Sequence, residues 1–398
     1  MERDRPLRPH RRDHRRAAGL QPISHAGSRR RRCRRHDRRA EVLILRSTAI
    51  ALGAALTGAA LFSFLGVPAG ALVGSTIFVT IASAFRLNPS VPSFLRDLGF
   101  TTIGVTLGAG ISPTFLSDLA RFPLSLAALT LTILAVMIVS SFVLRRMFGA
   151  GHATSVLATS PGALSYALSL ATGSGGGAAS VDTKMVMVLQ SLRLLLITIC
   201  LPPVIALVDG AADHHAAAGA AMPHALGLPV SVALIAASAL LGTLASKLRL
   251  PAAHLLAGVL LSGLGHGAGL MEGRPAFALT FIGFSLAGAV IGSRFAKITL
   301  AEIRSLGLSG LVATGIALAL SGAISFVMAY VLALPFGQVW VSYAPGGVEG
   351  MSAMALSLGY DPAYVATHHI YRLLLIIAIV PFFLRPAKAE AKDEGDGA

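Results

Sequence analysis

One signature occurs twice in this chain. The first copy occupies residues 158–202 and the second residues 342–381. Each copy begins with a Pro-Gly pair, reaches an aspartate, and then enters an apolar stretch that carries one arginine and closes on a proline. The Pro-Gly pairs lie 184 residues apart, and the later pairs lie 179 apart because of a glycine-rich insertion at 173–177. A duplicated element in an apolar chain is typical of membrane transporters built from two repeats.

Composition and hydropathy predict an all-α polytopic membrane protein. Charged residues make up only 13% of the chain, against roughly 25% in soluble proteins. Apolar stretches of about 20 residues, enough helix to cross about 30 Å of hydrocarbon, occur at 47–65, 69–85, 122–144, 185–208, 230–246, 252–270, 305–333 and 364–384. Weaker glycine-rich segments occur at 98–112, 152–171, 277–293 and 336–358. Alternating strand patterns are absent, so a barrel is not expected.

An arginine-rich arm precedes the first apolar stretch. Residues 1–46 contain sixteen arginines and five acidic residues, which is most of the net charge of +15. We expect a disordered cytoplasmic arm, with translation from an upstream start codon as an alternative origin. Such an arm could bind anionic lipid or nucleic acid. It lacks the interleaved aromatic residues and the zinc or helix-turn-helix patterns of nucleic-acid binders, so no nucleic-acid partner is expected.

Basic residues indicate which loops face the cytoplasm. With the arm inside, the cytoplasmic loops hold Arg86, Arg96, Arg145, Arg146, Lys247, Arg249, Arg294, Lys297 and Arg304, and the tail, with Arg385, Lys388 and Lys392, is also expected inside. The linker at 210–229 has neither lysine nor arginine and is expected outside. We therefore expect a multi-pass protein of the bacterial inner membrane with both termini in the cytoplasm. The first apolar run is long enough to span, so no cleavable signal peptide is expected.

The charge pattern favours two inverted repeats, at 47–209 and 230–385. Twelve full crossings would place the linker inside, against its composition. The conflict disappears if the two Pro-Gly segments do not cross fully, which leaves five transmembrane helices and one re-entrant or broken helix in each repeat. Because five is odd, the second repeat would be inserted upside down relative to the first. Broken helices that meet near the midplane form the substrate site of inverted-repeat transporters.

A pair of Gly-x-x-x-Gly motifs extends the duplication. Gly104 and Gly108 match Gly288 and Gly292 at the offset of 184. Small residues at this spacing let helices approach closely. Helix packing is therefore favoured over ion binding for these glycines.

Candidate substrate- or ion-binding residues lie at and after the two breaks. Proline interrupts a helix and frees backbone groups for a ligand, although a simple kink is the alternative. A carboxylate inside a membrane segment is costly and usually functional, so Glu349 is a candidate coupling group or else an interfacial residue. The aspartates could instead cap helices, and the histidines could relay protons or pack. Each arginine should pair with a carboxylate, a carbonyl or an anionic substrate, or snorkel to the headgroups. The set is Pro161, Gly162, Ser165, Asp182, Arg193, Pro345, Gly346, Gly347, Glu349, Asp361, His368, His369 and Arg372.

Sequence motifs of enzymes and metal sites are missing from the chain. There is no HExxH, Walker or GxSxG pattern, and Cys33 and Cys200 form no metal or disulfide framework. We therefore expect no enzymatic activity, no cofactor and no metal.

The duplicated pattern A-x-x-P-G-G, D, V, R-x-L-L, P resembles the AbrB membrane family over about residues 47–385. The second copy matches closely, whereas the first has Ala163 in place of the second glycine and a longer linker. The family carries the inherited names of a regulator of gene expression and of an ammonia monooxygenase. Nothing in the sequence supports oxygenase chemistry, because no copper or iron ligand set is present. Its broad similarity to inverted-repeat cation and anion transporters suits the expected topology.

Together these features predict a secondary transporter of a small solute, coupled to H⁺ or Na⁺. The expected partners are a small-molecule or ion substrate and the lipid bilayer, and a homo-oligomer is compatible with the sequence. The alternative is a membrane-embedded regulator of gene expression that acts through a partner and transports nothing.

Overall fold

The chain is helical wherever its structure is described. The computed structural model describes residues 25–111, 122–161, 181–209, 225–248, 250 and 252–384, with side chains from residue 42 onward except at 348, 349, 362, 363 and 373. Within these ranges the only β-pairing is an isolated bridge between Ala225 and Arg274. Seven described helices are long and apolar enough to cross a membrane. The predicted all-α class is confirmed, as expected for a bilayer, where helices satisfy their own backbone groups.

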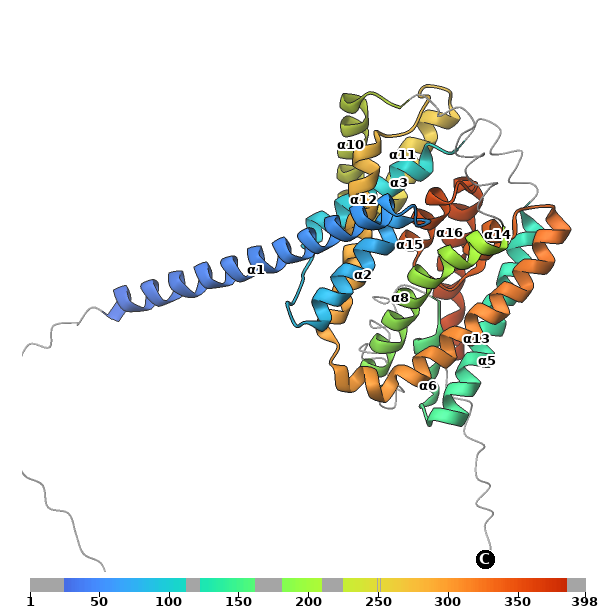
Figure 1. Ribbon diagram of the computed structural model, residues 1–398, viewed down its shortest axis with the longest axis horizontal. Coiled ribbons are helices and arrows are strands. Elements are labelled where there is room, and N and C mark those ends of the chain that lie inside the picture. Colours follow the sequence, from blue (N-terminus) through green and yellow to red (C-terminus); the bar gives the residue numbers. More distant parts are fainter. Residues whose placement is uncertain are drawn as a thin grey trace, which may run out of the picture. The chain divides into compact units, whose positions relative to one another are not determined.

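The described helices of the first half are α1 (His25–Phe64), α2 (Gly70–Ala84), α3 (Ser93–Gly108), α5 (Pro123–Phe148), α6 (His152–Thr159) and α8 (Thr183–Val208). Those of the second half are α10 (Leu228–Lys247), α11 (Ala253–Gly267), α12 (Phe277–Ser293), the 3₁₀ turn η1 (Arg294–Lys297), α13 (Leu300–Leu332), α14 (Phe336–Tyr343), α15 (Val348–Ser357) and α16 (Pro362–Phe383). Figure 1 shows their arrangement.

Helix bounds recur between the halves at nearly constant offsets. The starts of α3 and α12, and of α6 and α14, differ by 184, and those of α2 and α11 by 183. Residues with a left-handed backbone conformation (positive φ) also recur at matching helix ends. α5 and α13 end on Gly149 (φ 65°) and Ala333 (φ 52°), while Ala69 (φ 55°) and Ala252 (φ 51°) precede α2 and α11. The repetition therefore extends beyond the signature to six pairs of helices. The counterpart of α15 would fall in 162–180, outside the described residues.

We call α2, α3, α10, α11, α12 and residues 46–64 of α1 the glycine bundle. Its largest contacts join a helix of one half to a helix of the other: α3 packs on α11, and α12 packs on α2. A methyl group on Gly108 would lie 2.7 Å from the backbone nitrogen of Gly263, and one on Gly292 would lie 2.8 Å from the carbonyl oxygen of Thr76. The Gly-x-x-x-Gly motifs thus lie where helix backbones touch, as expected for helix packing.

The remaining helices, α5, α6, α8, α13, α14, α15 and α16, form what we call the arginine bundle (Figure 1). α13 packs on α5 and α8, α6 contacts both α5 and α8, and α14 contacts both α13 and α16. The short helix α15 also contacts α2, α3 and α12 of the glycine bundle. It therefore links the two bundles.

Large apolar side chains face outward from the arginine bundle. Leu131 and Phe142 of α5 are 61% and 65% exposed, and Phe326 of α13 is 68% exposed. A continuous apolar surface of this kind is unusual on a protein in water. It suits contact with lipid hydrocarbon.

Helix α1 begins inside the arginine-rich arm. It starts at His25, where the sequence predicts disorder, while residues 1–24 and the tail at 386–398 lie outside the described residues. Arginine, alanine and leucine favour helix, and extending an existing helix is easier than nucleating a new one. The chain divides into two compact units within α1, after residue 45: residues 1–45 and residues 46–398.

The prolines that close the two signatures do not end their helices. α8 continues through Pro202 to Val208, and α16 continues through Pro381 to Phe383. Neighbouring helices in a membrane protein can support an interrupted hydrogen-bond ladder.

Candidate functional site

Two short helices stop at the Pro-Gly pairs. α6 ends at Thr159 and α14 at Tyr343, two residues before Pro161 and Pro345. A residue that precedes proline is pushed out of the helical conformation, and Ser160 and Ala344 are extended accordingly. Each short helix has eight residues, a rise of about 12 Å. That is too short to cross a membrane.

Arg193 of α8 binds the break in the first half. Its Nη1 and Nη2 atoms donate hydrogen bonds of 3.1 Å to the carbonyl oxygens of Thr159 and Ser160. These carbonyls belong to the last residue of α6 and to the residue after it, where helix carbonyls lack partners and carry the negative end of the helix dipole. The sequence left a carboxylate, a carbonyl, an anionic substrate or the lipid headgroups as partners for Arg193, and in the structure it binds carbonyl groups.

Arg372 of α16 does the same in the second half. Its Nη1 atom donates to the carbonyl oxygen of Ala344 at 2.6 Å, and its Nη2 atom donates to that of Gly346 at 2.7 Å. The side chain is buried. The planar fork of a guanidinium group suits two acceptors at once, so each arginine holds the chain where its helix is interrupted.

Both predicted aspartates act as helix N-caps. Asp182 accepts a hydrogen bond of 3.0 Å from the backbone nitrogen three residues on, and Asp361 accepts one of 3.3 Å in the same way. The backbone nitrogen of Asp182 donates to Thr154 of α6, and that of Asp361 donates to Gln338 of α14. Thr154 and Gln338 are 184 residues apart. Each cap therefore also ties a long helix to a short one.

His368 belongs to a buried polar cluster that the sequence did not predict. Its Nδ1 atom lies 2.7 Å from the carbonyl oxygen of Tyr364 and its Nε2 atom lies 2.8 Å from Ser125 Oγ. Because a carbonyl oxygen can only accept, Nδ1 carries the proton and Nε2 accepts from the serine. The hydroxyl groups of Tyr343 and Tyr364 also lie within 2.9 Å of Ser125 Oγ. The cluster joins α5, α14 and α16.

His369 differs from its counterpart in the first half. Gln190 occupies the matching position and donates a 2.7 Å hydrogen bond to the carbonyl oxygen of Leu157. His369 is 0% exposed, and neither of its ring nitrogens has a hydrogen-bond partner among the described residues. A buried polar group left unpaired costs about 1–3 kcal/mol. These nitrogens are therefore available to a proton or a ligand.

Several predicted site residues lie partly or wholly outside what the structure describes. Gly162 and Ser165 fall in the undescribed range 162–180. Glu349 is the second residue of α15, with a side chain that is not described. Pro345, Gly346 and Gly347 link α14 to α15. Among the described residues, no three histidine, cysteine, aspartate or glutamate side chains are grouped to hold a metal ion.

Sequence comparison assigns the family. The model of the AbrB family, described as transition state regulatory protein AbrB, matches residues 71–388. The chain belongs to the AbrB family. A relative from Bacillus subtilis (strain 168), the uncharacterized protein YhjN, is 26% identical over 357 residues, which cover 84% of this chain and 91% of the relative. The family match includes both breaks and both arginines, which confirms the resemblance seen in the sequence.

Proposed function

We propose that this AbrB-family chain is an ion-coupled secondary transporter of a small solute. The observation that carries the proposal is the interrupted helix that occurs once in each half, held by a buried arginine from the long helix that follows. Interrupted backbone at membrane depth is tolerated where it is buried in protein or lines a cavity. Paired interrupted helices in two repeats are how many secondary transporters build a substrate site.

The proposal includes an inverted second repeat. Among the described residues, each half has five helices of fifteen residues or more beside one eight-residue helix, α6 or α14, and the second half also has the short helix α15 and the turn η1. If the short helices do not cross, the two halves have opposite orientations in the bilayer. The glycine bundle, with its touching backbones, would be the rigid part, and the arginine bundle would move against it during transport.

Cysteine labelling tests the orientation. Cys33 and Cys200 are first replaced by serine and alanine, since Cys200 is exposed. A new cysteine at Ala217, in the linker, should then react with a membrane-impermeant thiol reagent in intact cells, whereas one at Ala150 should react only after the cells are opened. Equal labelling of both positions in intact cells, or the reverse pattern, would contradict the inverted arrangement.

Uptake into proteoliposomes tests transport and coupling. A thermal-shift screen of small anions, amines and ions on the purified protein would first select substrates, and uptake would be driven by a H⁺ or Na⁺ gradient. Glu349→Gln should abolish coupled uptake while the protein still inserts, because the amide keeps the shape and loses the charge. Glu302→Gln is the matched control, since glutamine can also serve in the capping box that Glu302 forms with Thr299. Unchanged coupling in Glu349→Gln would refute the role of Glu349.

A regulator without transport is the second candidate, favoured by the description of the family model. The two functions separate in cells that lack the gene. If transport is the function, Glu349→Gln should fail to restore normal gene expression even when it is present in the membrane at the wild-type level. Full restoration by this variant, together with no uptake by the wild-type protein, would favour the regulator.

A further inference from the structure

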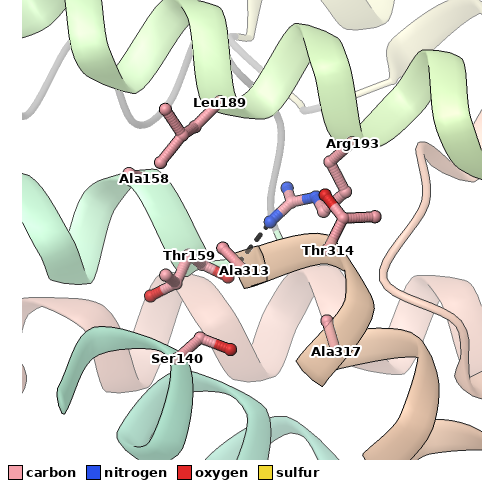
Figure 2. A pocket seen from close by; sticks show the side chains of 8 residues that line it. All are labelled: Ser140, Ala158, Thr159, Leu189, Arg193, Ala313, Thr314 and Ala317. Atoms are coloured by element: carbon pink, nitrogen blue, oxygen red, sulfur yellow. Dashed lines mark hydrogen bonds between the residues drawn. The ribbon is translucent and has the colours of Figure 1, made fainter. Parts of the chain in front are cut away.

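A small cavity lies beside Arg193, where α5, α6, α8 and α13 meet. The volume of the cavity is about 10 Å³, which is room for one water molecule or one monatomic ion. Figure 2 shows Arg193 reaching from α8 past Thr314 toward Thr159. The lining residues are Ser140, Ala158, Thr159, Leu189, Arg193, Ala313, Thr314 and Ala317.

The cavity borders a buried positive charge. Arg193 is only 6% exposed, and its two terminal nitrogens donate to neutral carbonyl groups, while its Nε atom has no hydrogen-bond partner among the described residues. Among the described residues no carboxylate forms an ion pair with it, and Arg294 is near enough to add repulsion. A buried charge without a counter-charge is strongly unfavourable. An anion in the cavity would supply that charge.

The rest of the lining offers hydrogen-bond donors and no carboxylate. Ser140 is buried, and its hydroxyl oxygen has no hydrogen-bond partner in the part of the chain that the structure describes. The hydroxyl group of Thr314 lines the same space, and the remaining contacts come mostly from alanine and leucine. The guanidinium group would repel a cation, and the lining has no carboxylate to bind one. A small anion would be attracted by the positive charge of Arg193 and could accept hydrogen bonds from the hydroxyl groups.

The second half repeats the arginine and the helix break but not most of the side chains that line this cavity. Different side chains occupy the positions that match Ser140, Thr159, Leu189, Ala313 and Ala317. They are Ile324, Tyr343, His368, Leu129 and Ile133, of which all but His368 are larger than their partners by aliphatic or aromatic carbon. Most of the lining is therefore not repeated together with the arginine and the helix break.

We propose that this cavity binds a monovalent anion of about the size of chloride. The ion would accept hydrogen bonds from the guanidinium group of Arg193 and from the hydroxyl groups of Ser140 and Thr314. The proposal does not depend on transport, since the site would bind its ion in a chain that moves no solute.

Halide titration of the purified full-length protein tests the site. The thermal midpoint is measured while chloride or bromide replaces gluconate at constant ionic strength, and bromide-soaked crystals are examined for anomalous scattering beside Arg193. We expect a saturable rise of the midpoint and an anomalous peak in the cavity. Equal midpoints in chloride and gluconate without a peak would overturn the proposal and leave a cavity that holds water only.

Two variants and one matched control connect the effect to the cavity. Ser140→Ala removes a donor, and Ala317→Ile fills the space with the residue found at the matching position of the second half. Each should weaken halide binding about tenfold or more. For Ser140→Ala this is the expected cost of losing a hydrogen bond to a charged group, and for Ala317→Ile the larger side chain would occupy the space of the ion. Ser325→Ala is the control, because Ser325 is also a buried serine with no hydrogen-bond partner but lies away from the cavity. If Ala317→Ile does not fold, Ser140→Ala decides. Equal weakening in the control, or none in Ser140→Ala, would contradict the site.

Discussion

Arg193 and Arg372 are buried cations that bind neutral carbonyl groups. In a membrane protein this arrangement has a clear physical reason. A helix that stops inside the protein leaves carbonyl groups without partners, and water is not available to satisfy them. A guanidinium group satisfies two of them and also meets the negative end of the helix dipole. The arginines therefore stabilise the two breaks.

We predict that Arg372→Lys lowers the free energy of unfolding by about 1.5–3 kcal/mol, the value of one hydrogen bond to a charged group. An ammonium group is a point donor and cannot hold both carbonyls in the fork geometry. Arg145→Lys, at an exposed position, is the control and should change little. Thermal unfolding in detergent measures both variants, and equal stability of the two would show that the fork is not needed.

His369 offers a second prediction at the level of one residue. His369→Gln should raise the stability by about 1 kcal/mol, because glutamine at the matching position of the first half reaches a helix carbonyl. The reciprocal change, Gln190→His, should lower it. If His369 carries the coupling proton, His369→Gln will be stable yet inactive in uptake. Equal destabilisation by both exchanges would refute the equivalence of the two positions.

At the level of helices, the glycine motifs determine which elements touch. Gly104 and Gly108 bring α3 against α11, and Gly288 and Gly292 bring α12 against α2. A methyl group at any of these positions would press on the backbone or a side chain of the partner helix. Close approach of this kind is the main source of helix association in lipid, where apolar surface gains nothing from leaving hydrocarbon.

Gly108→Ala should therefore destabilise the protein by about 1–3 kcal/mol through overpacking. Gly315→Ala is the control, because a methyl group there would have no atom within 4 Å. Alanine favours helix over glycine by about 1 kcal/mol, so the control should be neutral or slightly more stable. Thermal unfolding compares them, and a neutral Gly108→Ala would mean that α3 and α11 can separate without cost.

The helices were largely predictable from the sequence, whereas the contacts between them were not. Hydropathy located the apolar part of the described helices but not the arginine-rich start of α1, and proline located both breaks. The binding partner of each arginine could not be predicted from the sequence, because a carboxylate, a carbonyl group and an anionic substrate can each pair with an isolated positive charge. The cluster around Ser125 was missed because its members come from three helices far apart in the sequence. Only Thr154 and Gln338 had an unused signal, namely their separation of 184 residues.

On the scale of the whole molecule, the arm and the membrane region are separate compact units. Deletion of residues 1–44 should leave insertion and the thermal midpoint of the remaining protein nearly unchanged, because the helices from α2 onward make their contacts within the second unit. Quantification of folded protein in the membrane tests this prediction. Loss of folded protein after the deletion would show that the arm supports the fold.

The exchange of partners in the glycine bundle has a consequence for biogenesis. α2 and α3 contact α12 and α11, which the ribosome makes more than a hundred residues later. The first half must therefore wait in the bilayer with its glycine-lined faces against lipid until the second half is inserted. Neither half should be stable when made alone, yet the two made as separate chains and cut at the linker should find each other, because the halves are held together by helix faces rather than by the linker.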